Sequence, residues 1–228
     1  MHIQGLQKLT LLDYPGKLAC TVFTAPCNLR CPFCHNSGLI TGWDDPMDWE
    51  EVRGFLESRV GILEGVCITG GEPTLHKDLA DYLAAIKDLG FLVKLDTNGT
   101  KPEVLVNLVD TGLVDYVALD VKNSPEKYGA TVGIDDLDLA PIAASIEFLL
   151  SGAVDYEFRT TVVREFHSED DLLKLASWIK GAKRYYLQTF VNSEQVLQDG
   201  LHPYATEEMM AFVELIKPII PEVEVRGI

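Results

Sequence analysis

Hydrophobic residues recur along the chain in two alternating patterns. Short runs rich in β-branched residues predict buried strands, and longer runs with apolar residues three or four positions apart predict helices. Strands are expected at residues 6–12, 18–24, 65–69, 91–95, 114–119, 156–163, 184–190 and 223–226. Helices are expected at about residues 49–59, 79–89, 139–150, 169–180 and 206–217, with a loop over residues 42–46. Such alternation is typical of strand–helix units around a parallel sheet.

Six of these strands, from residues 18–24 to residues 184–190, form the expected core. Because a full barrel closes with eight strands, six predict an α/β fold of the open, partial (β/α)6 barrel type. The chain shows no repeat, low-complexity tract or linker-like composition, so we expect one domain spanning residues 1–228. In folds of this kind, the loops after the C-terminal ends of the parallel strands carry the active site.

Composition narrows the possible classes of function. Hydrophobic residues at 47% and charged residues at 24% are ordinary values for a globular protein. A net charge of −16 argues against a nucleic-acid partner, because nucleic-acid binders present a basic surface. The first residues lack the pattern of a signal peptide, and no apolar run is long enough to span a membrane. We therefore expect a cytoplasmic protein without a membrane partner.

A loop after the first core strand contains three of the five cysteines, Cys27, Cys31 and Cys34. Thiolates are the ligands that iron–sulfur clusters and zinc select. Three cysteines would leave one iron of a 4Fe-4S cluster without a protein thiolate, and thus an open coordination position. With His35 the same cysteines could instead form a structural zinc site, although adjacent side chains such as Cys34 and His35 seldom converge on one ion.

The other two cysteines, Cys20 and Cys67, lie inside apolar strand-like runs. We expect both to be small core residues.

Polar motifs follow three of the predicted strands: Gly-Gly-Glu-Pro at residues 70–73, Asp-Thr-Asn-Gly at residues 96–99, and Asp-Val-Lys at residues 120–122. Each has a simpler explanation, because Gly-Gly and Asn-Gly mark turns and an alternating Asp and Lys often form an exposed ion pair. Their shared position at strand ends instead favours a pocket for a polar ligand. The two glycines would let the backbone approach that ligand closely.

Two polar residues inside predicted strands, Arg159 and Gln188, are weaker candidates for the same pocket. Arg159 could lie on an exposed edge or be paired, and Gln188 could satisfy buried backbone groups. Three histidines, His76, His167 and His202, fall in no motif and are expected at the surface.

The spacing Cys-x3-Cys-x2-Cys, with Phe33 directly before the last cysteine, resembles the signature of the radical S-adenosylmethionine (radical SAM) enzymes. In that family the three cysteines hold a 4Fe-4S cluster, and S-adenosylmethionine chelates the fourth iron. The resemblance makes Cys27, Cys31 and Cys34 the metal ligands and the catalytic centre. It also places Phe33 beside the adenine and the Gly-Gly-Glu motif at the amino group of S-adenosylmethionine. The family fold, a six-stranded partial barrel, covers most of the chain.

The Asp-Thr-Asn-Gly and Asp-x-Lys motifs resemble more narrowly the activating enzymes of glycyl radical enzymes, and Cys34-His35-Asn36 also fits that pattern. This resemblance implies that Asp96, Thr97 and Asp120 lie beside the methionine carboxylate, together with a monovalent cation. It implies a position near the ribose and the carboxylate for Lys122, which we assign to the catalytic set as well. The full set of expected cofactor-binding residues is Phe33, His35, Asn36, Gly70, Gly71, Glu72, Asp96, Thr97, Asn98, Asp120, Lys122, Arg159 and Gln188.

The activity implied by the resemblance is reductive cleavage of S-adenosylmethionine and formation of a glycyl radical on a partner enzyme. The expected partner is an anaerobic ribonucleotide reductase, and a flavodoxin- or ferredoxin-like protein is the expected electron donor. The chain has no second cysteine cluster, which favours the simpler activases that lack a ferredoxin-like insert. Two alternatives stay open: a radical SAM enzyme acting on a small molecule, as 7-carboxy-7-deazaguanine synthase does, and a structural zinc-binding module.

Overall fold

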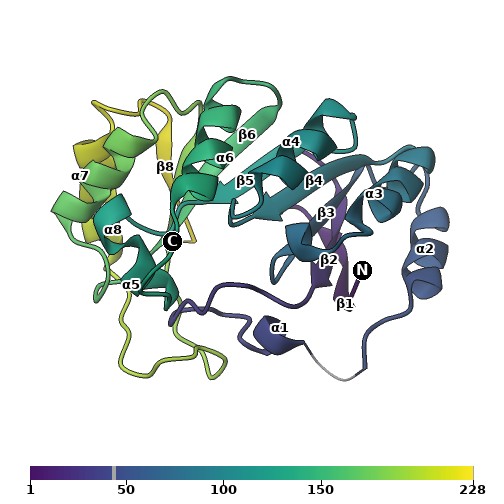
Figure 1. The fold of residues 1–228 in the computed structure, drawn as a ribbon, viewed down its shortest axis with the longest axis horizontal. Helices are drawn as coiled ribbons and strands as arrows, with labels where there is room; N and C mark the ends of the chain where they lie inside the picture. Colours follow the sequence, from purple (N-terminus) through teal and green to yellow (C-terminus); the bar gives the residue numbers. More distant parts are fainter. Residues whose placement is uncertain (43–44, 228) are drawn as a thin grey trace. The chain divides into compact units, whose positions relative to one another are not determined.

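The structure is a computed structural model that describes residues 1–42 and 45–227, so part of the expected loop at residues 42–46 lies outside the described residues. The chain divides into two compact units, each described by itself. One comprises Met1–Asn28 and Gly38–Ala118, and the other comprises Leu29–Ser37 and Leu119–Ile228. Strands and helices alternate along the chain (Figure 1). The expectation of one domain stays a prediction.

Over its described residues, the first unit contains four strands of its own and the first part of a fifth. The strands are β1 (Ile3–Thr10), β2 (Ala19–Thr24), β3 (Gly65–Gly70), β4 (Leu92–Thr97) and β5 (Tyr116–Asp120), the last of which continues into the second unit. The helices are α1 (Gly38–Thr41), α2 (Trp49–Glu57), the 3-10 helix η1 (Pro73–Leu75), α3 (Leu79–Asp88) and α4 (Pro102–Asp110).

Strand pairing in the first unit combines one hairpin with parallel strands. Strand β1 pairs antiparallel with β2, whereas β2, β3 and β4 run parallel, and their register aligns Thr21 with Cys67 and Cys67 with Lys94. Successive side chains of a strand point to opposite faces of the sheet. One face of β3 and β4 is therefore apolar, with Val66, Ile68, Val93 and Leu95 completely buried. The other face carries Cys67, Lys94 and Asp96.

The second unit repeats the alternation, with three strands of its own up to residue 227. These are β6 (Asp155–Val162), β7 (Tyr185–Thr189) and β8 (Val223–Arg226), which pair parallel in the order of the sequence. Its helices are the 3-10 helix η2 (Pro125–Lys127), α5 (Tyr128–Val132), α6 (Ala140–Leu150), α7 (Glu169–Trp178) and α8 (Thr206–Ile216).

The sheet of the second unit also has one apolar and one polar face. Tyr156, Phe158, Tyr185 and Leu187 are completely buried on the apolar face. The opposite face carries Glu157, whose carboxylate accepts hydrogen bonds of 2.8 and 2.9 Å from both terminal nitrogens of Arg226. The Arg226 guanidinium also stacks 3.3 Å from the centroid of the Tyr186 ring. The buried carboxylate on this face is therefore matched by a guanidinium.

The strand and helix predictions are confirmed apart from boundaries and the short helices. Asp48 begins α2 by accepting a hydrogen bond from the Glu50 amide, and Ser168 begins α7 through a capping box with Asp171. Cys20 and Cys67 are completely buried, as predicted. In the described part of the chain, no helix has both the length and the apolar character that crossing a membrane requires.

Helices α1, α4 and α5 were not expected from the pattern. Helix α4 has recognisable signals, because Pro102 occupies its first turn and Glu103 follows, with Gly112 just beyond its end. Helices α1 and α5 have only four and five residues, which is too short for a periodic pattern to emerge.

Replacing Arg226 with Met should lower the free energy of unfolding by about 3 kcal/mol, because the substitution removes the guanidinium that donates two hydrogen bonds to the completely buried Glu157 carboxylate. The measurement is urea unfolding followed by circular dichroism. Arg164→Met is the matched control, since Arg164 forms a similar pair with Glu208 and stacks on Tyr204, but both charged side chains are about two-fifths exposed. The control should lower the free energy of unfolding much less, because an exposed ion pair contributes little to stability. Equal losses of unfolding free energy in the two variants would contradict the assignment of Arg226 and Glu157 as a buried pair.

Candidate functional site

A completely buried carboxylate, that of Glu72, lies just after β3 and joins two of the predicted motifs. Its Oε1 accepts hydrogen bonds from the Thr74 amide (3.0 Å), the Thr74 hydroxyl and the Thr97 hydroxyl (2.8 Å), and its Oε2 accepts one from the Asn98 amide (2.7 Å). Burial raises the pKa of Glu72, while these hydrogen bonds oppose the rise. The Gly-Gly-Glu and Asp-Thr-Asn-Gly turns are therefore held together by one side chain.

The Asp-Thr-Asn-Gly turn is also connected to the cysteine loop. The Asn98 side chain donates to Asn28 Oδ1 at 2.9 Å, and the Asn28 side chain donates to the Thr100 hydroxyl at 2.9 Å. Asn28 directly follows Cys27, so the position of this cysteine depends on contacts with a turn about 70 residues further along the chain.

Gly70 and Gly71 pack against the backbone that leads into the cysteine loop. Gly70 has a φ of +113°, and a Cβ atom built on it would lie 2.4 Å from the Thr24 nitrogen. A Cβ atom on Gly71 would lie 2.4 Å from the Pro26 carbonyl oxygen. The Gly71 amide donates to Thr24 at 2.7 Å and the Glu72 amide to Pro26 at 3.0 Å. These backbone contacts are sufficient to explain why glycine occupies both positions. Close approach of the backbone to a ligand here stays a prediction.

Asp96 has a partner that the sequence did not identify. The Lys94 ammonium, completely buried in the middle of β4, is paired with Asp96 Oδ1. A single charged residue between Val93 and Leu95, two positions before a candidate residue and so on the same face, was the signal available in the sequence.

In the second unit, three predicted residues form one ionic cluster. Asp120 accepts hydrogen bonds from the Lys122 ammonium at 3.0 Å and from Arg159 Nε at 2.9 Å. Burial opposes ionisation of Asp120, but Arg159 and Lys122 outweigh it and hold the pKa of Asp120 well below its usual range. Burial would likewise lower the pKa of Lys122, but Asp120 and the Cys31 sulfur outweigh that effect and raise it. Arg159 thus directly contacts Asp120, another residue predicted to bind the cofactor.

The cysteine loop of the second unit is ordered by local and aromatic contacts. The Cys34 amide donates to the Cys31 carbonyl at 3.0 Å. The Phe33 ring is buried and packs 5.8 Å from the Phe166 ring. His35 stacks on Phe190 with the ring centroids 5.5 Å apart, and burial together with Lys122 lowers the pKa of His35.

His167 is buried, so the expectation that it lies at the surface is wrong. Its Nε2 donates to the Lys122 carbonyl at 2.8 Å and its Nδ1 accepts from the Val163 amide at 3.1 Å. Burial lowers the pKa of His167, which favours this neutral form. No local motif marked His167, because its role depends on a carbonyl 45 residues away. His167 therefore positions the backbone of the Asp-x-Lys motif.

The remaining candidates have fewer contacts. Asn36 is exposed, and Gln188 is partly buried on β7, where it aligns with Thr161 and Arg226. Among the described residues, no three His, Cys, Asp or Glu side chains are grouped closely enough to hold a metal ion. The ligand set of Cys27, Cys31 and Cys34 thus stays a prediction.

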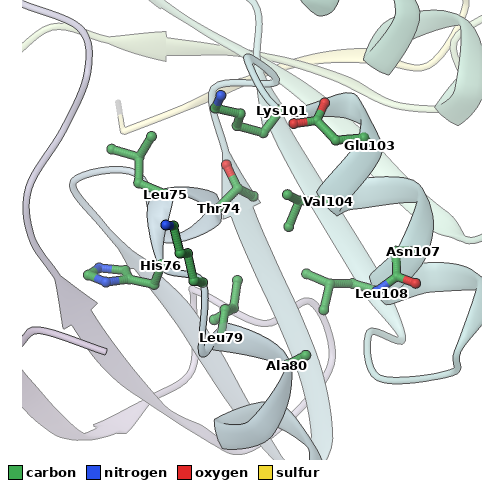
Figure 2. Close-up of a pocket in the computed structure, with 11 residues that line it drawn as sticks. Thr74, Leu75, His76, Leu79, Ala80, Lys101, Glu103, Val104, Asn107 and Leu108 are labelled. Atoms are coloured by element: carbon green, nitrogen blue, oxygen red, sulfur yellow. The ribbon is translucent and has the colours of Figure 1, made fainter.

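A hollow of about 610 Å³ lies in the first unit. Figure 2 shows its lining side chains, which come from residues 74–80, over η1 and the start of α3, and from residues 101–108, over α4 and the residue before it. Of the predicted site residues, none lines this hollow. Thr74, which donates to Glu72, contributes to its wall.

Comparison with known proteins gives consistent matches. The model of the radical SAM superfamily matches residues 21–179. A Methanocaldococcus jannaschii protein, provisionally named a glycyl-radical enzyme activating enzyme, is 36% identical over 192 residues, which cover 82% of this chain and 79% of that protein. The 7-carboxy-7-deazaguanine synthase of Koribacter versatilis is 30% identical over 161 residues, which cover 69% of this chain and 67% of that protein.

The chain belongs to the radical SAM superfamily. The solved structure of Streptococcus suis SuiB bound to S-adenosylmethionine agrees in fold, with a TM-score of 0.71 at 14% identity over 90% of this chain, which spans about half (49%) of SuiB. The predicted α/β fold class is thereby confirmed, as are the 4Fe-4S cluster and S-adenosylmethionine that this superfamily uses. A structural zinc module is no longer a suitable interpretation of the cysteines.

The donor set of this radical SAM chain suits those cofactors. All three loop cysteines are thiols outside disulfides. The Lys122 ammonium acts electrostatically on Cys31, and a nearby cation favours the thiolate form that binds iron. Cys27, Cys31 and Cys34 would hold the cluster.

Gly71→Ala should lower the free energy of unfolding by about 2 kcal/mol, because its Cβ atom would overlap the Pro26 carbonyl. It should also lower the iron bound per chain after anaerobic reconstitution. Gly54→Ala in α2 is the control, since nothing lies within 4 Å of its added Cβ atom. That change should leave the iron content unaltered and stabilise the helix by up to about 1 kcal/mol. Normal iron and stability in Gly71→Ala would disprove the packing argument.

The free energy of unfolding should decrease as the pH is lowered, because the buried His167 imidazole is neutral in the folded chain. The pKa of His167 is lowered in the folded chain, so as the pH falls the unfolded chain binds a proton at this position before the folded chain does. The contribution of neutral His167 to the free energy of unfolding is therefore complete above about pH 6.5 and is lost as the pH falls below that value. One such proton changes the free energy of unfolding by up to about 1.4 kcal/mol per pH unit. His167→Gln should reduce the slope measured by urea unfolding between pH 7.5 and pH 5. His202→Gln, which removes an exposed imidazole, serves as the comparison variant.

Proposed function

We propose that this radical SAM enzyme activates a glycyl radical enzyme, with an anaerobic ribonucleotide reductase as the expected partner. The observation that carries the proposal is the 36% identity with the Methanocaldococcus jannaschii relative, which extends over 82% of this chain. The relative's name refers to glycyl-radical enzyme activation. A flavodoxin- or ferredoxin-like protein would donate the electron.

The ionic cluster of the second unit supports the proposal. Asp120, Lys122 and Arg159 carry one negative and two positive charges, so the cluster has an excess positive charge. Their side chains are 27, 15 and 13% exposed, respectively, which leaves them accessible to a ligand while limiting the surrounding water. An anionic group such as the methionine carboxylate of S-adenosylmethionine would be attracted to this cluster. In the proposed function, Lys122 and Arg159 bind and orient that group.

The first unit supports the proposal through a rigid arrangement of turns. Glu72 holds the Gly-Gly-Glu turn against the Asp-Thr-Asn-Gly turn, and Asn98 holds Asn28 beside Cys27. When bound, the cluster and S-adenosylmethionine supply the one-electron chemistry. The chain contributes orientation and exclusion of water, so it needs few acid or base side chains.

The proposed reaction conserves atoms and electrons. One electron from the donor, one S-adenosylmethionine and one glycine Cα–H bond of the partner give methionine, 5′-deoxyadenosine and a glycyl radical. The hydrogen atom passes from the glycine to the deoxyadenosyl carbon.

A second candidate function is synthesis of 7-carboxy-7-deazaguanine. The 30% identity with the Koribacter versatilis enzyme over 69% of this chain favours it. The Methanocaldococcus jannaschii relative is more similar and covers more of the chain, so activation of a glycyl radical enzyme is preferred.

We expect a glycyl radical doublet in the electron paramagnetic resonance spectrum when the reconstituted chain is incubated anaerobically with dithionite, S-adenosylmethionine and an anaerobic ribonucleotide reductase. The physical reason is hydrogen abstraction from the radical-forming glycine of that partner. Formation of 5′-deoxyadenosine is measured in parallel.

Two controls test the source of that signal. Cys31→Ala should abolish both the doublet and 5′-deoxyadenosine, because one cluster ligand is missing. Replacing the radical-forming glycine of the partner with Ala should remove the doublet alone. Formation of 5′-deoxyadenosine without a doublet on anaerobic ribonucleotide reductase or pyruvate formate-lyase would reject the proposal, and 7-carboxy-7-deazaguanine formation would then establish the second candidate.

A further inference from the structure

A lysine in the middle of β4 is completely buried. The Lys94 side chain is 1% exposed, and its strand neighbours Val93 and Leu95 are buried on the opposite, apolar face. Lys94 aligns with Cys67 of β3, and Asp96 lies two residues further on the same face. Lysine is almost never completely buried unless it is paired.

The Lys94 ammonium has two partners. It is paired with Asp96 Oδ1 and lies 3.9 Å from the Cys67 sulfur, which itself lies 3.7 Å from Asp96 Oδ1. A buried ion pair often adds no more stability than apolar residues of similar volume would. Stability alone therefore does not account for a lysine here, in a strand whose opposite face carries the buried Val93 and Leu95.

The pair affects the charge at the end of β4. Asp96 is followed by Thr97, whose hydroxyl donates to the buried Glu72 carboxylate. Two carboxylates near these turns would repel a ligand that itself carries a carboxylate, as the methionine part of S-adenosylmethionine does. The Lys94 ammonium cancels the charge of Asp96. A dissolved Na⁺ or K⁺ at the same carboxylate would be repelled by that ammonium.

We propose that Lys94 is a positioning residue that acts as the built-in counter-ion of Asp96. It holds Asp96 in place and makes binding of S-adenosylmethionine independent of dissolved monovalent cations. The inference rests on the S-adenosylmethionine pocket of the proposed function, but it does not depend on the partner enzyme.

The test is the dissociation constant of S-adenosylmethionine, measured by anaerobic equilibrium dialysis with the cluster-loaded chain. The buffers contain NaCl, KCl or choline chloride at equal ionic strength. For the wild-type chain, the three constants should agree within about twofold, which is less than about 0.5 kcal/mol. For Lys94→Met, binding in choline chloride should weaken about tenfold, and Na⁺ or K⁺ should restore most of it by taking the place of the ammonium.

Two further variants distinguish charge from packing. Cys67→Ala removes the sulfur partner of the ammonium but leaves Lys94 paired with Asp96, so binding of S-adenosylmethionine should stay independent of the salt. In the double variant Lys94→Met with Asp96→Asn, both charges are absent, so added Na⁺ or K⁺ should not improve binding. The double variant also removes the charge of Asp96, which makes it the better folded comparison if Lys94→Met alone is unstable.

Three results would overturn the inference. The first is a wild-type chain that needs Na⁺ or K⁺ to bind S-adenosylmethionine tightly. The second is a Lys94→Met variant that binds S-adenosylmethionine normally in choline chloride. The third is weakened binding by Lys94→Met that neither cation restores, which would indicate a merely structural role for Lys94. A wild-type chain that does not bind S-adenosylmethionine in any salt would overturn the pocket together with the inference. Absence of a glycyl radical with unchanged dissociation constants would count against the proposed function alone.

Discussion

The buried carboxylate of Glu72 is the constraint on which the first unit depends. It is completely inaccessible to water, and such a group is tolerated only when its hydrogen-bonding capacity is used within the protein. Its four donors come from η1 and from the end of β4, so the two turns after β3 and β4 can form together or not at all. The glycines before Glu72 are required by the same packing, because they press against the backbone leading to Cys27.

In the second unit, the carboxylate of Asp120 is stabilised by cationic side chains. Asp120 is held between Lys122 and Arg159, and the backbone of Lys122 is fixed by the buried imidazole of His167. Phe33, within the cysteine loop, packs against that imidazole with the ring centroids 6.5 Å apart. In this unit, too, a residue of the cysteine loop is connected by short contacts to a motif at the end of a strand.

Local patterns were sufficient for the strands, most helices and the cysteine spacing, because these depend on residues close in sequence. Contacts between distant residues were not accessible in the same way. Thr97 and Glu72 are 25 residues apart, and Glu157 and Arg226 are 69 apart. Burial of His167 likewise follows from a distant carbonyl. Lys94 was overlooked because one charged residue in an apolar run does not change the strand pattern, although it changes the charge beside Asp96.

Charge distribution connects these features to the chemistry of a radical SAM enzyme. The chain carries a net charge of −16, but its buried clusters do not share that excess. Asp96 is neutralised by Lys94 and Glu157 by Arg226, whereas Asp120 has two cationic partners. One of those cations, Lys122, acts on Cys31, where positive charge favours the thiolate that an iron–sulfur cluster requires. The acidic excess therefore belongs mainly to the exposed surface, whereas the Asp120 cluster carries one more positive than negative charge.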